Sequence, residues 1–374
     1  MRSNAEMTPG TSSAAKPNRR EGSEKRCVIA STATAVPPHA LSRDIVKEYF
    51  GRVFGISGRR LDAILDVVDH SRIDKRHTIF PVDYLIEPRP LAKINSEYRD
   101  HAIALSRCAA KRALERAGVA ASDVDLIVTV SCTGVMIPSV DAYLAPELGL
   151  RSNVRRLPIT ELGCAAGAAG LTRAWEYLRA YPEATVLLVA VELPSLTFQR
   201  RDLTQANLIS TILFGDGAAA AVITGRPASG PAILDSESFL FPSSIDAMGF
   251  DLRDEGFHIV LSKEVPELIR SRVGGLVDDF LARHSLARDD MKAWVLHPGG
   301  QKLLAFMQKE LGLCDCQTQP SWDVLRDYGN LSSASVLFVL HEWLQRGAMT
   351  PGDRGLLAAF GPGFSAEMLL LQWT

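Results

Sequence analysis

Three residue types that together could carry out acyl-transfer chemistry occur in the chain in the order cysteine, histidine, asparagine. Cys164 lies in Gly163-Cys164-Ala165, between an apolar segment and a run of small residues that favours a helix. This places the thiol at a helix N-terminus, where free backbone N–H groups stabilise an anion and lower the pKa of a cysteine. A reactive thiolate is therefore the first functional expectation, and a cysteine simply buried in a tightly packed helix is its alternative.

His297 and Asn330 supply the groups that such a nucleophile would need. His297 ends an expected strand and precedes a Pro-Gly-Gly turn, where a ligand can approach the backbone closely. Asn330 lies just before an expected helix start. Taken singly, the histidine could close a strand and the asparagine could cap a helix or form a turn. Taken together, both side chains can donate hydrogen bonds to the oxyanion that develops on a thioester carbonyl or an enolate.

Cysteine proteolysis and carbon–carbon condensation of thioesters both use these three residue types. A papain-like protease would need a Cys-Gly-Ser-Cys-Trp-like context near the mature N-terminus. Here the flanking sequence is Leu162-Gly-Cys-Ala-Ala-Gly167, deep within an α/β chain. Thioester condensation is therefore the favoured chemistry.

Strands and helices that could position these residues alternate along the whole chain. Expected strands lie at 27–35, 124–130, 185–191, 217–224, 293–297, 355–360 and 367–373. Expected helices lie at 42–54, 98–117, 139–148, 164–181, 265–284, 301–311 and 332–345, and the basic stretch 59–77 is expected to be irregular. This alternation predicts an α/β fold with mixed sheets that are covered by helices on both faces.

The chain is expected to consist of a tail and two similar halves. Residues 1–26 are polar and contain no apolar stretch, so we expect a disordered arm and not a secretory signal. The Gly/Pro-rich segment 225–231 is the expected boundary between the two halves. It gives an N-terminal half at 27–226 with the cysteine and a C-terminal half at 227–374 with the histidine and asparagine.

Composition excludes several classes of function. A net charge of −2 over 374 residues argues against nucleic acid as the main partner, because phosphate binding needs a concentrated basic face. The sequence has no run of 18 apolar residues, so no membrane span is expected. Six cysteines lack disulfide-framework spacing, which predicts a reduced, cytoplasmic protein. Cys314-Asp-Cys316 has no second Cys/His pair nearby, so no metal is expected.

Five segments, in this order, resemble the type III polyketide synthases, which are the chalcone and stilbene synthases and their bacterial relatives. They are Leu162-Gly-Cys-Ala-Ala-Gly167, Leu213-Phe-Gly-Asp-Gly-Ala-Ala-Ala220, His297-Pro-Gly-Gly300, Tyr328-Gly-Asn-Leu-Ser-Ser333 and Ala359-Phe-Gly-Pro-Gly-Phe364. Gly-Asp-Gly or His-Pro-Gly alone would be weak, but together the five are highly specific. Val130-Ser-Cys-Thr-Gly-Val-Met-Ile-Pro-Ser139 most resembles the bacterial tetrahydroxynaphthalene synthases, since plant enzymes usually have threonine at the position of Cys132.

The resemblance implies a thiolase-like αβαβα fold, a homodimer and iterative condensation of CoA thioesters, with no permanently bound cofactor. Cys164 would match the nucleophile that carries the acyl chain, and His297 and Asn330 the pair that assists malonyl decarboxylation. Phe214 would match an aromatic gatekeeper between the CoA tunnel and the cavity, where an apolar ring disfavours the malonyl carboxylate. The expected substrates are malonyl-CoA and an acyl-CoA, and an acyl carrier protein is a candidate donor of the starter.

Departures from the family pattern fall in the expected cavity and at the CoA site. Ile259 stands where a second gatekeeper phenylalanine is usual, and Phe250 where naphthalene synthases have tyrosine. A ring without the hydroxyl cannot hydrogen-bond a polar malonyl starter, so a more apolar starter is expected. The other expected cavity residues are Cys132, Thr197, Met248 and Ser332. The basic residues that hold CoA in plant members are not clearly matched in this sequence. The candidates for CoA binding are the arginines Arg59, Arg60, Arg72 and Arg76 and the glycines Gly299 and Gly300.

The resemblance predicts that an acyl starter is extended several times with malonyl-CoA and cyclised to a pyrone or a phenolic ring. One alternative is a tetrahydroxynaphthalene-type synthase that uses malonyl-CoA alone. Another is a ketoacyl-ACP synthase III-like enzyme that condenses once, against which Phe214 and the ending Phe360-Gly-Pro-Gly363 argue. A non-catalytic descendant is the third, and the presence of all three site residues argues against it.

Overall fold

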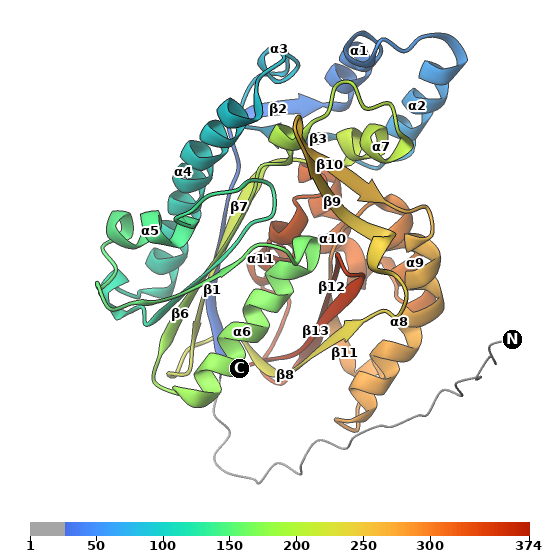
Figure 1. Cartoon of the computed structure of the whole chain (residues 1–374). Coiled ribbons are helices and arrows are strands. Elements are labelled where there is room, and N and C mark those ends of the chain that lie inside the picture. The colour runs from blue at the N-terminus through green and yellow to red at the C-terminus, as the bar shows by residue number, and fades with distance from the viewer. Residues whose placement is uncertain (1–26) are drawn as a thin grey trace, which may run out of the picture.

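One mixed sheet of nine strands runs through the molecule, and Figure 1 shows its course. The structure is a computed structural model that describes residues 27–374, and the arm expected at 1–26 lies outside them. The strand order is β11-β12-β13-β8-β1-β7-β6-β4-β5. The strands of the first half are β1 (Val28–Ala35), β4 (Leu126–Val130), β5 (Arg155–Ile159), β6 (Thr185–Glu192) and β7 (Gly217–Thr224). Those of the second half are β8 (Pro231–Leu240), β11 (Met291–Leu296), β12 (Arg354–Gly361) and β13 (Ser365–Trp373).

The same strand arrangement occurs twice within this sheet. In β4-β6-β7-β1 the first pairing is parallel and the next two are antiparallel, and β11-β12-β13-β8 repeats that pattern. The two halves of the sheet meet at a single residue pair, Val28 with Ala232, beside a 2.8 Å hydrogen bond from the Ile233 N–H to the Cys27 carbonyl. The expected α/β fold with two similar halves is confirmed, while the exact boundary between 226 and 227 stays a prediction.

Helices cover both outer faces of the sheet and fill the space between its halves (Figure 1). On one side α4 (Leu91–Ala117) packs against β1, β6 and β7, with α5 (Val140–Leu148) beside it. On the other side α8 (Val265–Ala282) and α9 (Gln301–Leu311) share a buried cluster with β11, β12 and β13, and α10 (Asp315–Tyr328) follows. Between the halves, α6 (Ala166–Ala180) and α11 (Ser335–Arg346) contact strands of both. This gives the five layers of the expected thiolase-like αβαβα fold.

Small residues in α6 allow the central layer to pack closely. A Cβ added at Gly167 would lie 2.1 Å from the carbonyl oxygen of Ser333, and one at Gly170 would lie 2.6 Å from the Leu188 side chain. The run Ala166-Gly-Ala-Ala-Gly170 therefore reflects close approach of α6 to its neighbours, and it holds the turn that carries Ser332 and Ser333 against the start of this helix.

A cap of short elements lies above one end of the strands (Figure 1). It consists of α1 (Arg43–Phe54), α2 (Gly58–His70), α3 (Val82–Leu85), α7 (Gln205–Leu213), the pair β2 (His39–Ser42) and β3 (Lys75–Thr78), and the hairpin β9 (Met248–Arg253)–β10 (Gly256–Leu261). The expectation of irregular structure at 59–77 is wrong, because α2 and β3 occupy most of it. Apolar residues at 61, 64, 65 and 68 have helical spacing that the surrounding Arg and Asp residues obscured.

Cys314 and Cys316 form a disulfide at the start of α10. The expectation of a reduced protein is therefore wrong for this pair, because the spacing of two residues brings their Cα atoms to 5.4 Å, within the range that a disulfide spans. The other four cysteines are free: Cys27, Cys108, Cys132 and Cys164.

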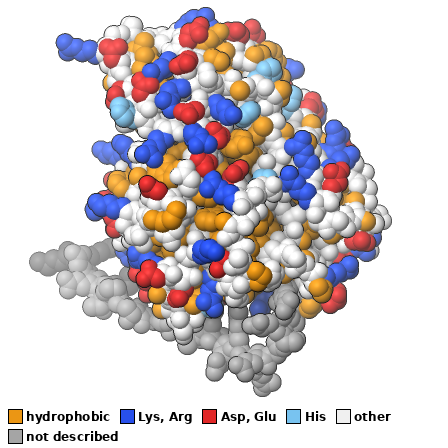
Figure 2. Space-filling view, turned by 180° about the vertical axis from the view of Figure 1, so that it is seen from behind, with side chains coloured by type: hydrophobic (Ala, Val, Ile, Leu, Met, Phe, Trp, Pro, Cys, Tyr) orange, Lys and Arg blue, Asp and Glu red, His pale blue; other side chains and the backbone are white. Residues whose placement is uncertain are grey.

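Acidic and basic side chains of the described residues are interspersed on the face seen in Figure 2, with hydrophobic side chains between them. This mixture differs from the concentrated basic face that nucleic-acid binding needs. Within residues 27–374, no helix is both long and apolar enough to cross a membrane.

Candidate active site

Cys164 lies in a single 3-10 turn, η2 (Gly163–Ala165), directly before α6. Gly163 has a φ of +47°, and a Cβ there would lie 2.6 Å from the ring of Pro362. Both the backbone conformation and the close packing therefore require glycine at this position. The Cys164 side chain is only 8% exposed, and its exposed part faces a cavity of about 590 Å³.

The helix position does not leave Cys164 as a thiolate at neutral pH. Burial raises the pKa of this thiol to about 11, and the nearby Glu192 carboxylate adds to the rise, against hydrogen bonds with Ser332 and Asn330 that lower it. The expectation of a lowered pKa is therefore wrong, because desolvation outweighs the helix N-terminus. Attack on a thioester at neutral pH consequently needs a group that takes the thiol proton.

Ser332 lies between the two cysteines that face the cavity. Its hydroxyl oxygen is 3.5 Å from the Sγ of Cys164 and 3.6 Å from the Sγ of Cys132. Ser332 belongs to the turn η6 (Ser332–Ala334), which packs against η2 across the start of α6. A single hydroxyl thus contacts both sulfur atoms.

Both the backbone and the side-chain amide of Asn330 form hydrogen bonds. Its backbone N–H donates to the Leu213 carbonyl at 2.8 Å, and its carbonyl accepts from the Gly215 N–H at 3.0 Å, which ties it to the segment of Phe214. The side-chain oxygen accepts from the Ser332 N–H at 2.8 Å, and the amide nitrogen donates to the Gly299 carbonyl at 3.2 Å. The amide orientation is therefore fixed, with its nitrogen near both the Gly299 carbonyl and the Cys164 sulfur.

His297 follows β11 directly and is 4% exposed. Its Nδ1 has no hydrogen-bond partner among the described residues, and burial lowers the pKa of the ring to about 4. The imidazole is therefore neutral near pH 7. A Cβ at Gly299 would lie 3.3 Å from the His297 ring, so Gly299 lies against both this ring and the amide of Asn330.

The residues expected to form the cavity wall come from both halves of the chain. Phe214 follows α7, Thr197 follows β6, and the hairpin β9–β10 places Phe250 directly opposite Ile259. All of the expected wall residues line the same cavity as Cys164: Cys132, Thr197, Phe214, Met248, Phe250, Ile259 and Ser332.

The four candidate arginines for CoA binding do not gather at one site. Arg76 lines the cavity, but it is buried and donates to a backbone carbonyl of α7, and burial lowers its pKa to about 10. Arg60 donates to a backbone carbonyl just before α7, and Arg59 is exposed and lines neither cavity described here. Arg72 lines a second cavity beside α9. Gly300 ends the turn before α9 with a φ of +153°.

Comparison with family sequences assigns the chain. A family model described as "Chalcone and stilbene synthases, N-terminal domain" matches residues 14–227, and the model of the corresponding C-terminal domain matches residues 233–373. The chain belongs to the chalcone and stilbene synthases. The resemblance to type III polyketide synthases is confirmed, and with it a condensing acyltransferase of the class that uses CoA thioesters.

Individual members of the family are similar over nearly their full length. A 1,3,6,8-tetrahydroxynaphthalene synthase from Streptomyces peucetius subsp. caesius is 39% identical over 350 residues, which are 92% of this chain and 93% of that protein. The crystal structure of the 1,3,6,8-tetrahydroxynaphthalene synthase from Streptomyces coelicolor A3(2) has a TM-score of 0.90 at 34% identity, covering 93% of this chain and 99% of that one. The structure of CsyB complexed with CoA-SH has a TM-score of 0.85 at 28% identity, covering 93% and 100%.

Glu192 is a buried carboxylate of this polyketide synthase that sequence reasoning missed. It ends β6 and accepts hydrogen bonds from the Ser333 hydroxyl at 2.5 Å, the Thr133 hydroxyl at 2.8 Å and the Cys132 N–H at 3.1 Å. Burial raises its pKa, and these donors lower it. A glutamate at the end of an otherwise apolar strand was the signal that could have revealed it.

An apolar arm of the cavity was also not foreseen. It runs under the cap, and its walls include Ile45, Tyr49, Phe50 and Phe54 of α1 together with Leu85 and Phe198. The sequence shows α1 as an amphipathic helix, but it does not show that part of the apolar face borders empty space. The arm gives this synthase room for an apolar group beyond the volume next to Cys164.

Proposed function

We propose that Cys164 takes an acyl group from a CoA thioester and that His297, Asn330 and Phe214 generate the nucleophile that extends it. The observation that carries the proposal is the meeting of three segments at Asn330. Its backbone pairs with the Phe214 segment, and its amide contacts Gly299, which lies against the His297 ring. Cys164 and Phe214 face the same cavity.

Loading would begin with attack of the Cys164 sulfur on the thioester carbonyl. The pKa of about 11 for the thiol and about 4 for the imidazole oppose proton transfer before substrate binds, so attack and transfer to His297 occur together. The protonated imidazole returns this proton to the departing CoA sulfur. An acyl thioester on Cys164, free CoA thiol and a neutral His297 result.

Extension would then use a malonyl thioester. Loss of CO₂ leaves its electron pair as an enolate, whose oxygen accepts hydrogen bonds from the neutral His297 ring and from the Asn330 amide N–H that contacts Cys164 before substrate binds. Phe214 presents an apolar surface to the malonyl carboxylate, which disfavours its charge and promotes decarboxylation. The enolate carbon attacks the acyl carbonyl on Cys164 and the bond to the sulfur breaks. The sulfur leaves as a thiolate and takes up a proton, and the chain, now on CoA, is longer by one two-carbon unit.

Separate measurements of decarboxylation and extension test these roles. Cys164→Ala should abolish polyketide formation and retain CO₂ release from malonyl-CoA. Asn330→Ala should lower CO₂ release about 10²- to 10³-fold, as expected for loss of one preorganised donor. Undiminished polyketide formation by Cys164→Ala would exclude the nucleophile role, and full CO₂ release by Asn330→Ala would exclude the enolate role.

We propose an apolar acyl-CoA of medium length or branched chain as the starter. The apolar arm of the cavity and the Phe250 ring, which contacts the Phe257 ring at 5.6 Å and offers no hydroxyl, support this choice. A synthase that uses malonyl-CoA alone is the second candidate, because a 1,3,6,8-tetrahydroxynaphthalene synthase is 39% identical. Mass spectrometry of products from a panel of acyl-CoA starters decides between them, and preferred turnover of malonyl-CoA alone to a naphthol would refute the apolar starter.

We further propose a homodimer in the cytoplasm, where CoA thioesters are made. Exposed apolar side chains at Val135 and Ile137 support an interface near the cavity, since Val135 also lines it. An acyl carrier protein as an alternative starter donor rests on the family resemblance and stays a prediction. Comparing starter transfer from acyl-CoA and from an acylated carrier protein would test it.

A further inference from the structure

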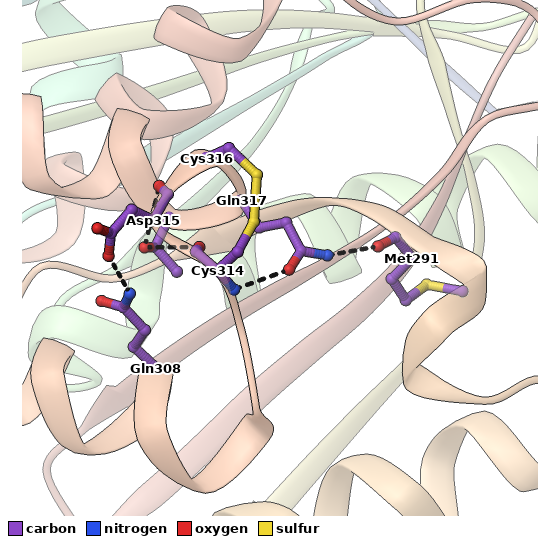
Figure 3. Close-up of a disulfide and its surroundings, with 7 residues drawn as sticks. Met291, Gln308, Cys314, Asp315, Cys316 and Gln317 are labelled. Carbon is purple, nitrogen blue, oxygen red and sulfur yellow. Dashed lines mark hydrogen bonds between the residues drawn. A yellow bond between two sulfur atoms is a disulfide. The ribbon is translucent and has the colours of Figure 1, made fainter.

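Figure 3 shows the disulfide between Cys314 and Cys316 where the turn after α9 leads into α10. Both of these cysteines are exposed, whereas the four free cysteines are buried or half-buried. A thiol from solvent can therefore reach the two sulfur atoms of the disulfide. The proposed condensation chemistry uses neither sulfur, so the role of the pair has to be sought outside the cavity of Cys164.

The disulfide closes a very small loop, since only Asp315 separates the two cysteines. The stability that a disulfide contributes grows with the length of the loop it closes, because a longer loop loses more freedom in the unfolded chain. A link across a single residue therefore adds less to the stability of the fold than a link between distant segments would. A permanent structural link is for this reason the poorer explanation of the pair.

Hydrogen bonds hold the turn around the disulfide as well. The Gln317 side chain accepts from the Cys314 N–H at 3.1 Å and donates to the Met291 carbonyl at 3.3 Å. The Gln308 amide nitrogen donates to the Asp315 carboxylate at 2.7 Å, so that this carboxylate points toward α9 (Figure 3). None of these three contacts involves a sulfur atom. The turn can therefore keep its path when the S–S bond opens, which a reversible reaction requires.

The same turn is connected to two elements that lead to the candidate active site. Met291, which Gln317 contacts, begins β11, and His297 directly follows the end of this strand. Helix α10 runs from the disulfide to Tyr328, two residues before Asn330. The disulfide therefore lies at the opposite end of the strand and the helix that position His297 and Asn330.

We propose that Cys314 and Cys316 form a reversible thiol–disulfide exchange site for a dithiol reductant, and that the redox state of the pair sets the order of the turn between α9 and α10. Such a pair suits the cytoplasm proposed above, where disulfides are mostly transient or redox-sensing. Cys314 is the N-cap residue of α10, and the helix N-terminus stabilises a thiolate there, which makes its sulfur the better leaving group. The inference does not depend on the proposed condensation chemistry, because the exchange needs no thioester.

Exchange with a dithiol proceeds in two steps. A thiolate of the reductant attacks the Sγ of Cys316, the S–S bond breaks, and Cys314 leaves as a thiolate. The second thiol of the reductant then loses its proton and attacks the reductant sulfur of this mixed disulfide, which releases Cys316. In total the pair gains two electrons and two protons, and the dithiol becomes a disulfide. The oxidised form of the same couple reverses the reaction.

Thiol labelling of the folded protein tests the exchange. The protein is equilibrated with reduced and oxidised dithiothreitol at several ratios, free thiols are alkylated with iodoacetamide, and the peptides are analysed by mass spectrometry. Cys314 and Cys316 should become labelled together as the ratio turns reducing, and samples returned to the oxidised reagent before alkylation should be unlabelled again. Burial raises the pKa of Cys27 to about 12, so this cysteine should stay unlabelled and is the internal control for folded protein. Labelling of the pair only in urea, or at every ratio, would overturn the inference.

Amide hydrogen exchange tests the effect on the turn. Reduction of the parent protein should speed exchange at residues 313–318 about tenfold, as expected for the opening of a short closed loop, and should leave α6 unchanged. Cys314→Ser/Cys316→Ser should exchange like the reduced parent, with or without dithiothreitol. Cys108→Ser removes a free cysteine outside the pair and is the matched control, which should respond as the parent does. Equal exchange at 313–318 in the oxidised and the reduced parent would show that the pair does not set the order of the turn.

Discussion

At the scale of single residues, the buried carboxylate of Glu192 adds to the raised pKa of both cavity-facing thiols. It receives a hydrogen bond from the Cys132 N–H at 3.1 Å and lies 3.5 Å from the Cys132 sulfur. Burial is the largest cause of the raised pKa at Cys132 and at Cys164, and the negative charge of Glu192 adds to both. The Cys164 thiol, the proposed nucleophile, is therefore neutral near pH 7.

Glu192→Gln should make Cys164 more reactive toward a simple electrophile. The amide removes a negative charge that raises the thiol pKa, so the pKa falls and the thiolate fraction at a given pH rises. Alkylation of Cys164 by iodoacetamide near pH 8, followed by peptide mass spectrometry, should be about three- to tenfold faster. Glu97→Gln changes another buried carboxylate, which is paired with Arg89, and serves as the control. An unchanged rate in Glu192→Gln would show that its charge does not reach the thiol.

At the scale of elements, the helix-starting turn of Cys164 and the turn of Ser332 meet across α6. Their contact depends on Gly167, because a Cβ there would lie 2.1 Å from the Ser333 carbonyl oxygen. The small residues of α6 therefore position the turn that carries Cys164 and also fill the central layer. Residues 163–170 could be predicted from the sequence as a helix start with close packing, but the partner that demands this packing could not, since it lies more than 160 residues away.

Gly167→Ala should destabilise the fold and disturb the site together. The added methyl group must push η6 away from α6, at a cost of about 1–3 kcal/mol. Thermal unfolding should shift down, and acyl loading onto Cys164 should slow. Gly275→Ala is the matched control, since Gly275 also lies inside a helix but a Cβ there meets nothing within 4 Å. That control should be neutral or slightly stabilising, by up to about 1 kcal/mol, and a similar loss in both variants would contradict the packing argument.

The imidazole of His341, on α11, connects this helix to β1 and α4. Its Nδ1 lies 2.8 Å from the Thr32 hydroxyl of β1, and its Nε2 lies 3.2 Å from the Arg116 guanidinium of α4. Because arginine only donates, Nε2 must be the acceptor and Nδ1 must carry the proton. Burial and then the charge of Arg116 lower the pKa of His341 to about 4.

This shift predicts a pH dependence of stability. The folded-state pKa lies below the ordinary value of 6.5, so the unfolded chain takes up the proton first as the pH falls. The stability that the neutral ring contributes is present above about pH 6.5 and is lost as the pH falls toward 4. In urea unfolding, His341→Gln should lose about 1–2 kcal/mol less than the parent between pH 7 and 4.5. An identical loss in both proteins would mean that the pKa of His341 is the same in the folded and the unfolded chain.

At the scale of the whole molecule, periodicity and motif order predict the layers better than the cap. The buried strands and the long helices carry clear patterns, so an α/β fold with helix-covered sheets and two similar halves could be inferred from 27–374. The αβαβα layering was implied by the family resemblance. The hairpin β9–β10 and helix α2 could not, because they bury few residues and charged side chains interrupt their patterns. The candidate site could likewise be predicted only in part. Motif residues could be named in advance, whereas Glu192, the apolar arm and the cavity of Arg72 arise from segments that meet only in the folded chain.

A dimer would account for the apolar surface near the cavity. Ile137 is 95% exposed and Val135 is 48% exposed, both on the loop that follows β4, and Val135 also lines the cavity of Cys164. Leaving two such side chains in water costs free energy that burial against a second copy would recover, at about 25 cal/mol per Å² of apolar surface.

Ile137→Asp should therefore shift the proposed dimer toward monomer in light scattering after size-exclusion chromatography, because the interface would have to bury an unpaired charge. Leu240→Asp places the same charge at another strongly exposed apolar position, at the end of β8, and should leave the molecular mass unchanged. If the interface lies beside the cavity, Ile137→Asp should also lower polyketide formation while Leu240→Asp does not. A monomeric parent protein, or a dimer that survives Ile137→Asp, would mean that this loop faces a different partner.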